Sequence, residues 1–247
     1  MDVSQTPTTP RLTWAARTDV GAVRQLNEDS WTVAEQPFFV AAVADGMGGH
    51  EAGEEASAAA VAAVREAAGE LAEPSLEDVG ALVSRAHEAV ESQVRAGAGT
   101  TLTLAACLDS DAREWAVANV GDSRIYRRPA GEPRLEQLTV DHSAVQMLVD
   151  AGELTPAEAR VHPRRNVITR ALGSPEQLVV DVGTLRLGAG DRLLLCSDGL
   201  TGELLDEEIL ALLDDSATPQ AAVDVLVDAA NWRGGRDNIT AIVLALD

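Results

Sequence analysis

The chain is organised around one stretch, Phe38-Phe39-Val40-Ala41-Ala42-Val43-Ala44-Asp45-Gly46-Met47-Gly48-Gly49-His50. An apolar run typical of a buried strand ends at an acid, and glycines and a histidine follow before an Ala-rich helical pattern begins. A carboxylate at the mouth of a buried strand, followed by a loop with almost no side chains, lets another group approach the main chain closely. The stretch therefore predicts a site at the end of this strand.

Two distant segments also place an acid at the end of an apolar run, and the first of them repeats the strand-Asp-Gly arrangement. The apolar run 193–196 leads through Ser197 into Asp198-Gly199, and Asp237-Asn238 lies directly before the apolar run 239–246. Hard carboxylate ligands without a Cys or His cluster favour a Mg²⁺ or Mn²⁺ site. Asp45 could instead simply cap the following helix. The recurrence favours metal ligation, because converging carboxylates are costly unless cations compensate them.

The composition restricts the class of partner. The 247 residues include 40 acidic and 19 basic side chains, which gives a formal net charge of −21. This charge argues against nucleic acid or an anionic membrane as the main partner. It would also repel an anionic substrate, unless bound divalent cations reversed the local field.

The sequence shows neither a membrane span nor a signal peptide. No run approaches the ~18 apolar residues of a membrane span. Residues 1–10 lack the basic and apolar regions of a signal peptide and are expected to form a disordered tail. Cys107 and Cys196 lie in apolar strand-like runs, where buried thiols are usual, so we expect no disulfide framework and a reducing cytoplasmic location.

The order of the elements predicts the fold class. Strands are expected at 12–18, 31–33, 38–44, 100–108, 114–120, 124–128, 179–187, 192–196 and 239–246. Helices are expected at 51–68, 76–94 and 143–150, and from Pro156, Asp206 and Thr218. The last strand is apolar on both faces and should lie at the centre of a sheet. Because strands and helices come in blocks without strict alternation, a layered α+β fold is favoured over a doubly wound sheet.

Several motifs occur in a specific order along the chain. They are Arg24-x-x-Asn27-Glu28-Asp29, Asp45-Gly46-Met47-Gly48-Gly49-His50, Gly99-Thr100-Thr101, Gly121-Asp122-Ser123-Arg124, Ser197-Asp198-Gly199 and Asp237-Asn238. Together they resemble the motif series of the metal-dependent protein phosphatase (PPM) family, the type 2C serine/threonine phosphatases, in its bacterial form. Asp141-His142-Ser143 and His162-Pro163-Arg164-Arg165-Asn166 resemble the flap region of that family.

The resemblance implies a four-layer α-β-β-α sandwich with two central antiparallel sheets and a helical flap insertion at about 142–177. Residues 11–247 would then form a single phosphatase catalytic domain. It further implies two Mn²⁺ or Mg²⁺ ions, with a third, weaker ion. The implied metal residues are Asp45, which would bridge both ions, Gly46 through its carbonyl, Asp198, Asp237, Asp122 at the third ion, and Glu28 and Asp29 through metal-bound water.

The resemblance also assigns the substrate contacts. Arg24 matches the phosphate-binding arginine of the family, since a guanidinium holds two phosphate oxygens at once. Met47 stands where some relatives carry a histidine that could protonate the leaving group. His50 could serve in its place, or could simply pack near the helix start, and His142 and His162 are further flap candidates. Metal-bound water is an alternative proton donor.

The flap carries Arg160, Arg164, Arg165 and Arg170, which could recognise phosphopeptides or only pair with the acidic body.

The expected activity is hydrolysis of phosphoserine and phosphothreonine in proteins, by attack of a water or hydroxide bridging two divalent metals. A dedicated regulatory phosphatase for one partner, of the anti-sigma-factor-antagonist type, is one alternative. A non-catalytic phosphoprotein-binding module is another, although the complete set of Arg24, Asp45, Asp198 and Asp237 argues against it. The implied partners are phosphorylated proteins, with serine/threonine kinases and their substrates among them, and the chain is expected to be a signalling monomer.

Overall fold

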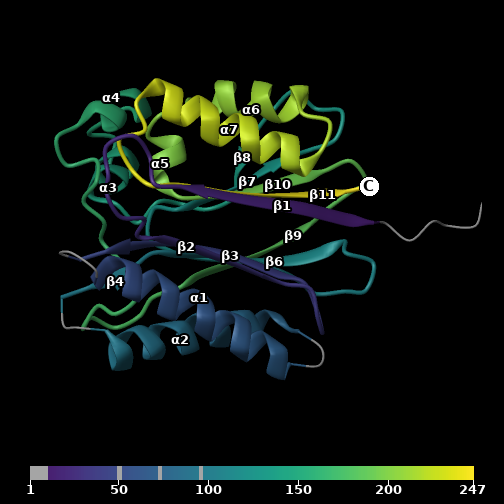
Figure 1. The fold of residues 1–247 in the computed structure, drawn as a ribbon, viewed down its shortest axis with the longest axis horizontal. Coiled ribbons are helices and arrows are strands. Elements are labelled where there is room, and N and C mark those ends of the chain that lie inside the picture. The colour runs from purple at the N-terminus through teal and green to yellow at the C-terminus, as the bar shows by residue number, and fades with distance from the viewer. Residues whose placement is uncertain (1–10, 49–51, 72–73, 95–96) are drawn as a thin grey trace, which may run out of the picture.

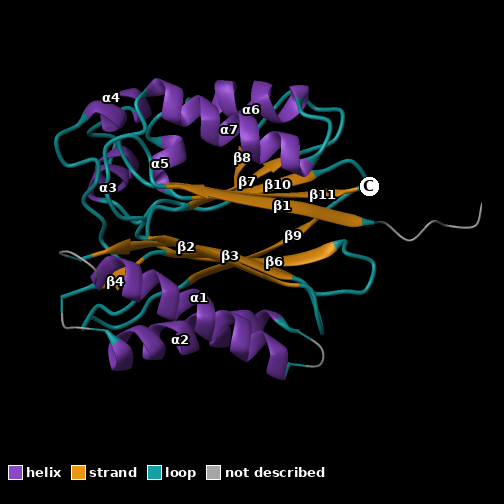
Figure 2. Ribbon diagram, viewed as in Figure 1, coloured by secondary structure: helices purple, strands orange, loops and turns teal. Residues whose placement is uncertain are grey.

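The computed structural model describes residues 11–48, 52–71, 74–94 and 97–247. Two β-sheets lie face to face, and helices cover the outer face of each sheet (Figures 1 and 2). This order of layers confirms the predicted α-β-β-α sandwich. The disordered tail expected at residues 1–10 lies outside the described residues.

All neighbouring strands pair in the antiparallel sense. The five-stranded sheet has the order β1 (Leu12–Asp19), β11 (Ile239–Leu246), β10 (Arg192–Cys196), β7 (Arg124–Arg128) and β8 (Glu136–Gln137). The six-stranded sheet has the order β2 (Asp29–Ala34), β3 (Val40–Met47), β5 (Leu102–Cys107), β6 (Glu114–Val120) and β9 (Asp181–Arg186), with β4 (Gly99–Thr100) paired to β3. β11 lies between β1 and β10, as its two apolar faces predicted.

Seven helices are present in the described part of the chain. Helices α1 (Ala52–Glu70) and α2 (Leu76–Gln93) cover the six-stranded sheet, and α6 (Asp206–Asp215) and α7 (Pro219–Arg233) cover the five-stranded sheet (Figure 1). The shorter α3 (Ala144–Asp150), α4 (Pro156–Val161) and α5 (Asp198–Thr201) lie at one end of the sandwich.

The core forms three layers because side chains alternate along each strand. Along β3, Val40, Ala42 and Ala44 face α1 and α2, whereas Ala41 and Val43 face the other sheet. β11 behaves in the same way, with alternate residues facing the helices and the space between the sheets. The strands can therefore be apolar on both faces, as the sequence showed.

Most helix starts follow their sequence signals. Ser75 Oγ accepts from the Asp78 amide at 3.3 Å, and Asp78 Oδ2 accepts from the Ser75 amide at 2.9 Å, which forms the predicted capping box. Thr155 caps α4 in the same manner with Glu158, and Pro156 occupies the first turn. These side chains satisfy main-chain N–H groups that the first helical turn leaves unpaired.

Two expected strand boundaries are wrong. β3 does not end at Asp45, because Gly46 pairs with Thr100 and Met47 pairs with Gly99, so the strand continues through the motif. The strand expected at 100–108 is divided into β4 and β5. The local pattern around Asp45 indicated a turn, and only the distant partner strand extends the ladder.

Candidate metal centre

The acidic residues of the motifs meet at one end of the two sheets. β3 and β10 run toward this end, and β2 and β11 start from it, since these strands pair in antiparallel fashion. Asp45 lies near the end of β3, Asp198 follows β10, and Asp237 comes shortly before β11. The turn that carries Asp122 connects β6 to β7 at the same end.

Asp45 is held by the β4–β5 segment. Its amide donates to Thr101 Oγ1 at 2.9 Å, and its carbonyl accepts from the Thr101 amide and from Thr100 Oγ1, both at 2.9 Å. Asp29 lies directly opposite Asp45 on the neighbouring strand β2. The main chain of Asp45 is therefore fixed on both sides, which holds its carboxylate in place.

Glycine is required where the main chains converge. A Cβ atom on Gly46 would lie 2.0 Å from the Gly53 carbonyl oxygen, and one on Gly199 would lie 1.9 Å from the Asn238 carbonyl oxygen. Real Cβ atoms do not approach backbone so closely, so a side chain at Gly46 would force β3 and α1 apart, and one at Gly199 would force α5 away from the loop before β11. The Asp-Gly pattern thus reflects the close approach of distant segments.

The clustered carboxylates perturb one another. Burial raises the pKa of Asp45 well above its ordinary value, and the charges of Asp29 and Asp198 raise it further. Burial also raises the pKa of Asp29 to about 7, despite hydrogen bonds from Ser197 and Thr240. The pKa of Asp198 rises to about 6, through burial and then the charge of Asp237. Burial and the charge of Asp198 raise the pKa of Asp122.

Two oxygen atoms at this centre are buried without a hydrogen-bond partner among the described residues, Glu28 Oε1 and Asp29 Oδ1. Buried carboxylate oxygens of this kind require a cation, water or a proton. Carboxylate and main-chain oxygens are also the ligands that Mg²⁺ and Mn²⁺ prefer. The residues present therefore fit a divalent cation.

The acids do not form a closed cage by themselves. Within the described ranges, no three Asp, Glu, His or Cys side chains lie close enough together to enclose a metal ion. Asp45, Asp122, Asp198 and Asp237 nevertheless line one cavity, and Mg²⁺ normally keeps several water ligands. The shared cavity and the unpaired oxygens of Glu28 and Asp29 are the features that fit a partly hydrated cation.

An open cavity of about 270 Å³ lies over the acids. It is lined by Arg24, Glu28, Asp45, Gly46, Met47, Gly48, Thr101, Asp122, Asn166, Ile168, Asp198, Asp237 and Asn238. Arg24 Nη2 donates to Asp237 Oδ2 at 2.7 Å, and Arg24 Nη1 lies 3.8 Å from Glu28 Oε2. The structure thus brings the predicted arginine to the edge of the acidic cluster.

Asn238 connects the loop before β11 to the segment that carries Arg24. Its Nδ2 donates to the carbonyls of Val20 and Leu26 at 2.9 and 2.8 Å, and its Oδ1 accepts from the Glu28 amide at 2.8 Å. These three bonds hold the connection between β1 and β2 against Asp237. Glu28 and Asp29 are thereby kept beside the cluster.

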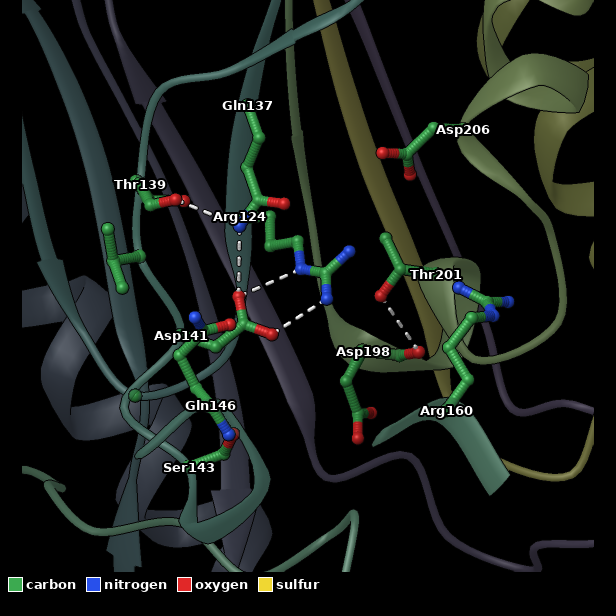
Figure 3. A network of polar contacts seen from close by, with 12 residues as sticks. Arg124, Gln137, Thr139, Asp141, Ser143, Gln146, Arg160, Asp198, Thr201 and Asp206 are labelled. Carbon is green, nitrogen blue, oxygen red and sulfur yellow. Dashed lines mark hydrogen bonds and ion pairs between the residues drawn. The ribbon is translucent and has the colours of Figure 1, made fainter. Parts of the chain in front are cut away.

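Sequence reasoning missed the ion pair that supports the Asp122 turn. Arg124 Nε and Nη2 donate to the two carboxylate oxygens of Asp141 at 2.8 and 2.7 Å (Figure 3). Arg124 Nη1 also donates to Tyr126 Oη at 2.7 Å. This network lies beside Asp198 (Figure 3). Both residues occur in quoted motifs, but nothing in their local patterns indicated that they pair.

The histidines have different environments. His142 is buried, its Nδ1 accepts from the Gly121 amide at 3.1 Å, and its Nε2 lies 3.0 Å from Asp181 Oδ2. This arrangement makes His142 a structural link to the Asp122 turn. His162 ends α4, and its Nδ1 accepts from the Arg164 amide. His50 lies outside the described residues, so its expected role stays a prediction.

The flap arginines have different environments. Arg160 Nη2 donates to the Leu204 carbonyl, and Arg170 pairs with Asp181 at 2.7 Å. Arg165 instead lines a second, smaller hollow together with Asp198 and Asp237. Two arginines therefore fasten the flap to the body, and one lies beside the metal centre.

The fold and the site together define a class, a metal-dependent hydrolase that binds an anionic substrate. Residues 20–230 match the family described as Protein phosphatase 2C. The chain is 38% identical over 245 residues to the serine/threonine phosphatase stp of Listeria monocytogenes, covering 94% of each protein.

Solved structures agree with the sequence relatives. The serine/threonine phosphatase PstP/Ppp of Mycobacterium tuberculosis superimposes with a TM-score of 0.86 at 38% identity, covering 96% of this chain and 99% of that one. The catalytic domain of PstP in complex with two manganese ions superimposes with a TM-score of 0.83 at 37% identity, covering 95% and 98%. The chain belongs to the protein phosphatase 2C family.

This membership confirms the expected enzyme class, a metal-dependent serine/threonine protein phosphatase, and its cofactor, Mn²⁺ or Mg²⁺. Phosphorylated proteins are its substrates. No helix in the described part of the chain is long and apolar enough to cross a membrane. Cys107 and Cys196 are buried unpaired thiols, and the cytoplasmic location stays a prediction.

Proposed function

We propose that this chain hydrolyses phosphoserine and phosphothreonine with Asp45, Asp198 and Asp237 as the residues that hold the cations. The observation that supports this assignment is their convergence, from three distant segments, around one cavity that also contains Arg24. Asp45 is the residue proposed to bridge the two cations, since it lines the cavity together with Asp122, Asp198 and Asp237. The Gly46 carbonyl and Asp122 are the further proposed ligands.

When bound, the cations lower the pKa of water toward neutrality and polarise phosphoryl oxygens. Glu28 Oε1 and Asp29 Oδ1 are proposed to accept hydrogen bonds from water in the site, because both are buried and lack a protein partner among the described residues. Asp29 Oδ2 already accepts from Ser197 Oγ at 2.7 Å, which orients its carboxylate and leaves Oδ1 for water.

Arg24 is proposed to hold the phosphate. One of its terminal nitrogens donates to Asp237, which fixes the guanidinium at the edge of the cavity and leaves further N–H donors. A planar guanidinium can bind two phosphate oxygens and so orient phosphorus for in-line attack. Phosphorylated kinases and their substrates are the proposed partners, and a panel of phosphoproteins would test how broad this set is.

The test is hydrolysis of a phosphothreonine peptide with Mn²⁺, measured for the wild type and for Asp45→Asn. Glu88→Gln is the matched control, since it removes one charge from the exposed face of α2, away from the cavity. We expect chelator to abolish activity, Asp45→Asn to lose it, and Glu88→Gln to retain it. Activity that survives both chelator and Asp45→Asn would overturn the proposal.

A further inference from the structure

Three exposed apolar side chains lie on the two segments that pack together beside Arg24. Trp232 is 85% exposed, Val23 is 64% exposed and Leu26 is 44% exposed. Trp232 is the most exposed large apolar side chain in the described part of the chain. We call these three residues the entrance patch.

The patch comes from two segments that pack against each other. The Ala22 amide donates to the Gly235 carbonyl at 2.7 Å, and Asn238 binds the Leu26 carbonyl. In Figure 1 the purple connection after β1 and the yellow connection before β11 lie side by side at the same end. The loop that holds Val23 and Leu26 is therefore fixed against the end of α7.

The helical register places Trp232 on the side of α7 that faces β1. Asp224 and Asp228 both form ion pairs with Arg17 of β1, at 3.6 and 2.8 Å. Trp232 follows Asp228 by four residues, so its side chain lies on the same side of the helix, one turn nearer to the metal centre. The connection that carries Val23 leaves β1 at this point.

Packing of α7 onto the sheet does not explain why residue 232 is a tryptophan. The core contacts of α7 come from Ala222, Val223, Leu226, Val227 and Ala230, which are all fully buried. A side chain with 85% exposure adds little to that core, and a large exposed apolar side chain is a common feature of protein-binding surfaces.

The patch is within reach of a bound phosphopeptide. Val23 precedes Arg24 directly, and Trp232 lies five residues before Asp237. Five extended residues span at most ~17 Å, so the tryptophan lies no farther than that from Asp237 along the chain. A substrate segment of similar length is long enough to connect a phosphorylated residue beside Asp237 to the patch.

We infer that the entrance patch binds an apolar side chain of the substrate protein, within about five residues of the phosphorylated residue. The inference rests on the proposed function. A chain of net charge −21 repels acidic phosphopeptides at a distance, and an apolar contact adds affinity that this repulsion does not remove. Tryptophan suits the role because it offers a large, rigid contact area.

The experiment compares phosphothreonine peptides that carry either one Leu or one Ser, scanned over the five positions on each side. Trp232→Ser removes the centre of the patch. Val225→Ser is the matched control, because Val225 is exposed on the same face of α7, two turns farther from the metal centre. p-Nitrophenyl phosphate reports on the catalytic centre alone.

We expect the wild type to prefer Leu over Ser at one or two positions, by about tenfold in kcat/KM, as for a moderate interface hot spot. Trp232→Ser should lose this preference while it hydrolyses p-nitrophenyl phosphate at the wild-type rate, and Val225→Ser should keep the preference. Equal use of Leu and Ser peptides by the wild type, or a preference that survives in Trp232→Ser, overturns the inference.

Two further outcomes are distinct. If neither the wild type nor either variant hydrolyses any substrate with Mn²⁺, the proposed phosphatase function fails, and the inference about the patch fails with it. Light scattering of the same samples tests a second copy of the chain as the occupant. A wild-type dimer that becomes a monomer in Trp232→Ser would show a self-association surface and overturn substrate docking.

Discussion

The Arg124–Asp141 ion pair offers a quantitative test of how the Asp122 turn is held. Asp141→Asn keeps the shape of the side chain but removes the charge that compensates Arg124. The two side chains are 21% and 12% exposed, so the pair is neither buried nor on the open surface. Burial by itself would lower the Arg124 pKa, but Tyr126 and Asp141 together raise it well above its ordinary value.

The magnitude follows from this intermediate burial. Loss of one partner of a fully buried pair costs about 3–5 kcal/mol, and exposed pairs contribute about 0–1 kcal/mol. We expect Asp141→Asn to lower the free energy of unfolding by about 2 kcal/mol, because Arg124 keeps its bond to Tyr126 and one bond to the amide oxygen, but loses the second bond and the compensating negative charge.

The assay is equilibrium unfolding in urea, followed by tryptophan fluorescence. Glu132→Gln is the control, since it alters the Arg134–Glu132 pair, in which both side chains are 54% exposed. This control should change the free energy of unfolding by less than about 0.5 kcal/mol. A loss equally small in Asp141→Asn would refute the reasoning, because the pair would then have the strength of an ordinary surface contact.

Three other variants or conditions probe the metal centre. Arg24→Ala should lower kcat/KM for p-nitrophenyl phosphate by about 10- to 100-fold, the equivalent of ~1.5–3 kcal/mol in charged hydrogen bonds; an unchanged value would exclude Arg24 from phosphate binding. In chelator, stability should fall as the pH rises from about 4 to about 7, because the raised pKa values of Asp29 (about 7) and Asp198 (about 6) make the native state bind more protons than the unfolded chain. A melting temperature in EDTA that increases from pH 4 to pH 7 would contradict this expected pH dependence. Ser197→Ala should cost about 1–3 kcal/mol in urea unfolding, because it removes a buried donor to Asp29 and a buried acceptor for the Thr240 amide; a cost below about 0.5 kcal/mol would show that water replaces the hydroxyl.

The sequence was informative wherever a local pattern determines a local structure. Capping residues located the starts of α2 and α4, and two-sided apolarity placed β11 inside its sheet. The repeated strand-Asp-Gly pattern predicted that Asp45 and Asp198 serve one site. The glycines at this site proved to be required by close approach between distant main chains.

Other features depend on residues far apart in the chain and leave no local pattern. β3 extends past Asp45 only because β4 pairs with it, more than fifty residues later. The hydroxyl of Thr101 that binds the Asp45 amide and the pairing of Arg124 with Asp141 are likewise consequences of the assembled fold. The bond that the buried His142 accepts from the Gly121 amide also had no signal in the local sequence.

The central claim is that Asp45, Asp198 and Asp237 hold the catalytic cations. Anomalous diffraction at the manganese edge, from crystals grown with Mn²⁺, tests it most directly. We predict at least two peaks at the end of the sheets, each about 2.0–2.3 Å from carboxylate oxygens of these residues, with Asp45 in contact with both ions. Peaks that lie elsewhere, or ions that Asp45 does not contact, would contradict the assignment.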